Sequence, residues 1–280
     1  MHRLLIQSLR WLDVRMVYLV TSLFVIPVCL LLNTNHSRTS AYHFYRHRLR
    51  YGRLRAAWSV YINHCLFSQV VVDRFAVFAG KHFHLDIEGY EHFRQLESEP
   101  KGFMIFSSHI GCYEVAGYSL ISKTKRFNAL VFGGEKATVM AGRQEVLGHH
   151  NIRMIPVKED MSHLFLVNEA LDNNEIMSMP ADRIIGSAKS VTSVFMDAEA
   201  RFPAGPLSVA TMKGLDVLAV NVMKTSAKHY KVYVARLSYD KQAPRRQQIQ
   251  QLADSYVKEL EDRVRQYPLQ WFNFYDFWSR

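Results

Sequence analysis

The stretch Phe103-Met104-Ile105-Phe106-Ser107-Ser108-His109-Ile110-Gly111-Cys112-Tyr113-Glu114 joins an apolar run to residues that can carry chemistry. Four consecutive apolar residues followed by small polar ones predict a strand buried on both faces, as in parallel sheets. The strand ends just before His109, and Glu114 follows five positions later. A histidine oriented by a carboxylate is the minimal device for taking a proton from an alcohol.

The His-x4-acid spacing is weak by itself, and its context separates the two matches in the chain. Composition alone predicts about one chance match. The second match, His92 and Glu97, lies in a charged stretch typical of a solvated helix. A straight helix would place His109 and Glu114 roughly 140° apart, because each residue turns by ~100°. Gly111 permits the bend that such a pair needs. The alternative is a structural histidine satisfied at a strand end.

Outward from this stretch, strand-like and helix-like segments alternate along the chain. The alternation predicts an α/β domain with a mostly parallel central sheet flanked by helices. The last two strands, joined by residues 225–228, predict a hairpin. We expect strands at 83–87, 103–107, 128–132, 152–157, 175–179, 191–196, 215–223 and 230–237. We expect helices at 54–80, 89–98, 112–123, 135–148, 161–172, 205–213 and 244–266.

The N-terminal region predicts a membrane anchor. Residues 16–32 contain no charge, and the length of this segment is at the lower limit for a bilayer span. Pro27 lies inside the segment. More arginines follow this segment than precede it, so the following domain is expected on the cytoplasmic side, whether the segment spans or lies in one leaflet. We therefore expect an anchor over 1–36 and a catalytic domain over 37–280. A buried core helix is the alternative. The arginines after the segment are Arg38, Arg46, Arg48, Arg50, Arg53 and Arg55.

Composition narrows the partners further. The 280 residues carry a formal charge of +10, which favours an anionic partner such as lipid headgroups or nucleic acid. Next to an apolar anchor, the lipid interpretation is the stronger one. The three cysteines have no metal-like spacing, and their odd number argues against a disulfide scaffold. We find no phosphate-binding glycine loop, nucleophile elbow or metal-ligand motif.

A second informative site follows the strand predicted at 175–179. Asp182 and Arg183 come directly after it, and ligands of α/β sheets gather at the carboxyl ends of strands. His109 and this pair are therefore expected to face one cleft. Arg183 is suited to neutralise a phosphate or a developing oxyanion, although an ordinary loop ion pair is the alternative. Cys112 is a candidate nucleophile, with packing as the simpler role.

These features occur in an order that resembles the bacterial lipid A biosynthesis (lauroyl/myristoyl) acyltransferase family, within the lysophospholipid acyltransferase superfamily. The shared features are the anchor, Ser108–Glu114 after a strand, Arg143 before Gly148, Pro180-Ala181-Asp182-Arg183, and the closing Tyr267-Pro268-Leu269-Gln270-Trp271. The chain departs from the family in having Cys112-Tyr113 where Asn-Trp is common. This difference leaves the acceptor lipid open.

The resemblance implies an O-acyltransferase that moves a fatty acyl chain from an acyl carrier protein or coenzyme A thioester to a lipid hydroxyl. His109 would be the general base and Glu114 would fix its tautomer, while Arg143, Asp182 and Arg183 would bind substrate. No metal or cofactor is expected. The expected partners are membrane lipids and an acidic acyl carrier protein, at the cytoplasmic face of a bacterial inner membrane.

Three other functions remain open at this point. A membrane lipid-binding protein without catalysis would use His109 and Glu114 structurally. A thioester hydrolase would use Cys112 as its nucleophile. Nucleic-acid binding is the weakest, because the basic segment adjoins an apolar one.

Overall fold

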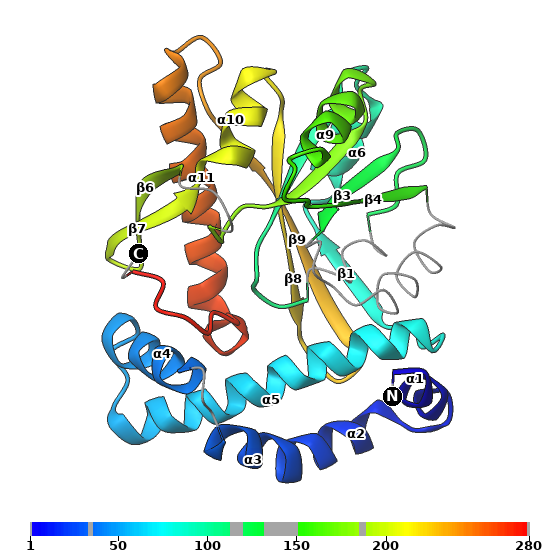
Figure 1. Ribbon diagram of the computed structural model, residues 1–280, viewed down its shortest axis with the longest axis vertical. Coiled ribbons are helices and arrows are strands. Elements are labelled where there is room, and N and C mark those ends of the chain that lie inside the picture. The colour runs from blue at the N-terminus through cyan, green and yellow to red at the C-terminus, as the bar shows by residue number, and fades with distance from the viewer. Residues whose placement is uncertain (1, 33–35, 113–119, 132–150, 185–188, 279–280) are drawn as a thin grey trace.

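The computed structural model describes residues 2–32, 36–112, 120–131, 151–184 and 189–278. Its centre is a seven-stranded sheet with strand order β1-β9-β8-β2-β5-β3-β4 (Figure 1). All neighbouring strands pair in parallel except β8 and β9, which form the predicted antiparallel hairpin. The mostly parallel α/β sheet is therefore confirmed. Its strands are β1 (His84–Glu88), β2 (Phe103–Ser107), β3 (Phe127–Val131), β4 (Ile152–Pro156), β5 (Ile176–Pro180), β8 (Val217–Lys224) and β9 (His229–Leu237).

Alternating side chains of β2 enter two hydrophobic clusters, one on each face of the sheet. Met104 and Phe106 belong to the larger cluster, and Phe103 and Ile105 to the smaller one. Burial on both faces is what a continuous apolar run predicts for a central parallel strand. Helix α6 (Tyr90–Ser98) covers the smaller cluster. The larger one is covered by α9 (His163–Asp172), α10 (Ala204–Met212) and α11 (Arg245–Gln266).

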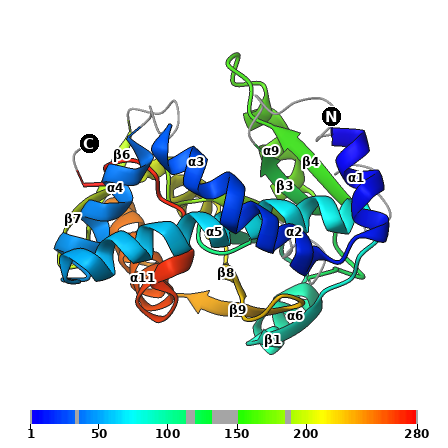
Figure 2. The same ribbon diagram turned by 90° about the horizontal axis from the view of Figure 1, so that it is seen from below.

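The N-terminal helices pack along α5 (Arg53–Phe78) at one end of the sheet (Figures 1 and 2). Residues 14–31 form one apolar segment that is long enough to cross a membrane, and only 17% of it is buried. Pro27 has no N–H to donate, and the turn before it widens, with the Ile26 N–H donating to Thr21 O. The elements are α1 (His2–Trp11), α2 (Val14–Val20), η1 (Thr21–Val25), α3 (Ile26–Leu31), α4 (Ser37–His43) and η2 (Phe44–Arg48).

β7 (Ala198–Pro203) is a strand that the sequence does not predict. It pairs antiparallel with β6 (Ser190–Phe195) in a separate two-stranded sheet. Phe202 of β7 is 1% exposed and packs against Phe195 and Phe277, so it forms core. Of the helix predicted at 112–123, residues 120–123 are not helical and 113–119 lie outside the described residues, as does the whole of the helix predicted at 135–148.

The aromatic C-terminal segment is core packing. It begins with η3 (Pro268–Gln270), and Trp271, Phe272 and Phe277 are each less than 5% exposed. Asn63 of α5 donates its side-chain amide to Leu269 O at 3.0 Å and to Trp271 O at 3.1 Å. The last residues of the described chain therefore close over α5 and return toward the end of β2.

Candidate active site

His109 and Asp182 meet because their strands are neighbours in register. Ser107 of β2 pairs with Pro180 of β5, and each of the two site residues lies two positions further on. The Asp182 carboxylate contacts His109 twice: Oδ1 lies 2.8 Å from Nδ1, and Oδ2 accepts the backbone N–H at 2.7 Å. One carboxylate thus fixes both the ring and the backbone of the histidine. The two strand ends therefore meet, as the sequence predicts.

Exposure of the two side chains differs sharply. The Asp182 side chain is 2% exposed, whereas the His109 side chain is 24% exposed. Burial raises the pKa of Asp182, but the neighbouring charges of His109 and Arg183 and the hydrogen bonds from His109 outweigh burial and hold it below its usual value. The carboxyl is therefore an anion at neutral pH. The sequence assigned Asp182 to substrate binding, and in the structure its buried carboxylate contacts His109.

The loop of residues 108–112, called here the His109 loop, bends at Gly111. Its φ is +60°, in the left-handed region, and a Cβ at this position would lie 2.0 Å from Val222 O. The predicted bend is therefore present. The Gly111 N–H donates to Gln270 O at 2.9 Å, and the Cys112 N–H donates to Val222 O at 2.7 Å. β8 and the C-terminal segment thus hold the loop from two sides.

Arg183 lies beside this pair on the next residue of the β5 loop. Its Nη2 donates to Phe272 O at 2.6 Å, and its guanidinium lies 5.7 Å from the centre of the Tyr275 ring. The Phe272 N–H in turn donates to His109 O at 3.1 Å. The arginine is therefore fixed to the segment that touches the His109 loop, and its positive charge acts on the Asp182 carboxylate. Glu114 and Arg143, the other predicted site residues, lie outside the described residues.

Cys112 has the packing role that the sequence favours, whereas Glu97 differs from its expected setting. Cys112 is 2% exposed and packs in the smaller hydrophobic cluster, which is a poor setting for a nucleophile. Glu97, predicted on a solvated helix, is 4% exposed and accepts from the Ser122 hydroxyl at 2.8 Å and the Lys123 N–H. A single carboxylate in a charged stretch gives no local signal that it accepts hydrogen bonds from a segment far along the chain. Among the described residues, no group of three His, Cys, Asp or Glu side chains is placed to hold a metal.

Fold and site together define an α/β protein with a histidine–carboxylate pair at the carboxyl ends of parallel strands. The model of the bacterial lipid A biosynthesis acyltransferases matches residues 76–280. The chain belongs to this family and is an acyltransferase that acts on lipids. No curated protein matches it. Among solved structures it is similar to the 1-acyl-sn-glycerophosphate (LPA) acyltransferase PlsC from Thermotoga maritima, with 14% identity, a TM-score of 0.41, and coverage of 97% of this chain and 99% of that one.

Proposed function

We propose that this protein transfers a fatty acyl chain from an acyl thioester to a hydroxyl of a membrane lipid, with His109 as the general base. The acyl carrier would be an acyl carrier protein or coenzyme A, and the acceptor a lipid A precursor or a lysolipid. The observation that carries the proposal is the double contact between Asp182 and His109. A buried carboxylate on Nδ1 fixes the tautomer whose Nε2 accepts a proton.

In the proposed reaction, the acceptor hydroxyl attacks the thioester carbonyl while His109 Nε2 takes the hydroxyl proton. The C–O bond forms, the C–S bond breaks, and the imidazolium returns the proton to the departing thiolate. Asp182 stabilises the imidazolium, a role that the sequence suggested for Glu114. General-base catalysis of this kind typically contributes ~10²–10⁴-fold.

Arg183 and Arg143 are the proposed groups for phosphate binding or for the oxyanion that forms on the carbonyl. For Arg183, this role is supported by the hydrogen bond that fixes its guanidinium to Phe272 O, beside the His109 loop. No metal or redox cofactor enters the proposed reaction, since proton transfer and charge stabilisation are supplied by side chains.

We further propose that the protein works at the cytoplasmic face of a bacterial inner membrane. Exposed apolar side chains on the N-terminal helices and an excess of arginines after them support this location. The net charge of +10 suits anionic headgroups and an acidic acyl carrier protein.

The test is a thiol-release assay on membranes that contain the full chain, with acyl-carrier-protein and acyl-coenzyme-A donors and with lipid products identified by mass spectrometry. We expect release that depends on added lipid, and a loss of roughly 10²-fold or more in His109→Ala. His92→Ala is the matched control, because His92 belongs to the chance His-x4-acid match on α6.

The outcomes separate the alternatives. Thiol release without an acylated lipid, retained in His109→Ala and lost in Cys112→Ala, would establish the hydrolase instead. Wild-type protein that binds lipid but is inactive with every donor would establish a binding protein and overturn the proposal.

A further inference from the structure

The His109 loop lies between β8 and the C-terminal segment and pairs with both. Isolated bridges join Gly111 to Val222 of β8 and Ile110 to Trp271 of the tail. On the β8 side the Ser108 hydroxyl also donates to Asn221 Oδ1 at 2.6 Å. The position of the imidazole therefore depends on the spacing between β8 and the tail.

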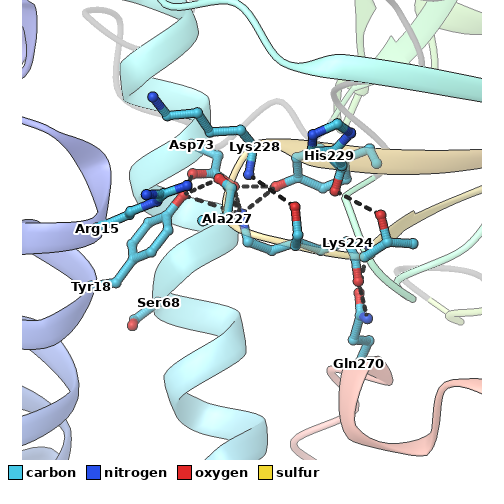
Figure 3. Close-up of polar contacts among 12 residues, drawn as sticks. Arg15, Tyr18, Ser68, Asp73, Lys224, Ala227, Lys228, His229 and Gln270 are labelled. Atoms are coloured by element: carbon cyan, nitrogen blue, oxygen red, sulfur yellow. Dashed lines mark hydrogen bonds and ion pairs between the residues drawn. The ribbon is translucent and has the colours of Figure 1, made fainter.

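Gln270 sets that spacing with its side chain. Its Oε1 accepts the Lys224 N–H at 2.9 Å, and its Nε2 donates to Lys224 O at 2.8 Å, so the amide closes on the last residue of β8 like a neighbouring strand (Figure 3). Its own backbone oxygen receives the Gly111 N–H. Gln270 is 7% exposed, so water does not compete for these bonds. One residue thus binds both the loop and β8.

Lys224 is a firm attachment point because its own side chain is held. Its ammonium forms a buried ion pair with Asp73 of α5, and the Tyr18 hydroxyl donates to the same carboxylate (Figure 3). The Tyr230 hydroxyl also donates to this carboxylate. Tyr18 belongs to α2, in the apolar N-terminal segment. The cluster therefore joins the N-terminal helices, α5 and the end of β8, and Gln270 extends the connection to the His109 loop.

We propose that Gln270 is a positioning residue, which fixes the His109 loop relative to β8 and the N-terminal helices. This inference rests on the proposed role of His109 as the base. It also gives a physical reason for the Gln-Trp pair in the closing motif, since Gln270 binds β8 and Trp271 bridges Ile110. Gln270 contacts no reacting group, so its effect passes through the placement of the imidazole.

The test compares Gln270→Met with Gln248→Met in the full chain. Methionine keeps the length of the side chain and removes both hydrogen bonds. Gln248 is a matched control because its side chain also donates to two backbone oxygens, those of Lys241 and Ala243, at the start of α11. We expect Gln270→Met to lower kcat by about 10- to 100-fold with little change in KM, because misplacement acts on the chemical step. Gln248→Met is expected to match wild type.

A second readout is independent of turnover. Cys112 is buried at the end of the His109 loop, so loosening the loop should make its thiol react faster with a labelling reagent, as measured by peptide mass spectrometry. Should Gln270→Met fail to fold, Asn63→Ala releases the same tail from the α5 side, and the same pair of effects is expected.

The two proposals fail in different ways. Inactive wild type, or active His109→Ala, overturns the role of His109. The positioning role alone is overturned if wild type is active and His109→Ala is inactive, but Gln270→Met keeps both the wild-type kcat and the slow labelling of Cys112. An equal loss of kcat in Gln248→Met would also overturn it, because the effect would then be general.

Discussion

A carboxylate that contacts the His109 ring, that of Asp182, comes from 73 positions away in the chain, whereas Glu114, five positions from His109, lies outside the described residues. A local motif suggests Glu114 but cannot suggest Asp182, because the sequence does not show which strands are neighbours. The order β2-β5 and the Ser107–Pro180 register bring Asp182 to the imidazole. The site was therefore predictable as two strand ends that face each other, but the contact between them required the three-dimensional order of the strands.

Asp182→Asn should lower kcat by roughly 10²-fold or more while the protein stays folded. The amide keeps the shape of the carboxylate, but it cannot hold Nδ1–H and the backbone N–H with two acceptor oxygens. The thiol-release assay and circular dichroism measure the two effects. Glu114→Gln is the comparison, and the assignment of Asp182 fails if that variant is inactive while Asp182→Asn keeps its activity.

Gly111→Ala should reduce both activity and stability. Its left-handed φ is strained for alanine, and the added Cβ would collide with Val222 O, so the His109 loop must shift. Gly52→Ala is the control, because a Cβ there meets nothing within 4 Å. Urea unfolding and thiol release are the measurements. Wild-type values in Gly111→Ala would show that the loop does not need this bend.

At the scale of elements, apolar periodicity was sufficient for most of the sheet and failed for β7. The hairpin between β6 and β7 turns at Met196 and Asp197, both with positive φ, which is the backbone of a two-residue hairpin turn. Asn-Gly is the usual signal for such a turn, and Met-Asp does not carry it. Tertiary packing of Phe202 against Phe195 and Phe277 stabilises the hairpin instead, and no local pattern reports that contact.

The cluster that joins α2, α5 and β8 is expected to dominate the stability of this end of the molecule. Burial raises the pKa of Asp73 and lowers the pKa of Lys224, so each partner depends on the other to stay charged. Lys224→Met should therefore cost about 3–5 kcal/mol of unfolding free energy, because it leaves a buried carboxylate without its cation. Urea unfolding measures this cost.

Two comparisons make this stability prediction specific. Asp73→Asn combined with Lys224→Met should be less destabilised than Lys224→Met alone, since the uncompensated charge is gone. Lys231→Met removes the exposed pair with Glu88 and should change stability little. A double variant as unstable as the single one would show that packing of the lysine stem, and not its charge, matters.

At the scale of the whole molecule, large apolar side chains are exposed mainly at one end. Trp11, Phe24 and Leu31 on the N-terminal helices are 90%, 68% and 80% exposed, and Leu54 and Trp58 on α5 are 88% and 64% exposed. Arg53 and Arg55 flank Leu54 and are also exposed. Apolar side chains mixed with arginines suit the boundary between acyl chains and anionic headgroups. Sequence alone predicted the anchor, but the exposed apolar side chains of α5 beside it required the packed structure.

If α5 contributes to this membrane-binding face, Leu54→Ser combined with Trp58→Ser should weaken binding of the full chain to vesicles that contain anionic lipid by at least roughly 10-fold, because two large apolar side chains lose their burial in lipid. Co-sedimentation at fixed ionic strength measures the change. Leu164→Ser and Phe165→Ser are the controls, since both side chains are exposed but lie on α9, away from the N-terminal helices (Figure 1). Equal weakening in the controls, or none in the α5 variant, would mean that α5 makes no specific contribution to membrane binding.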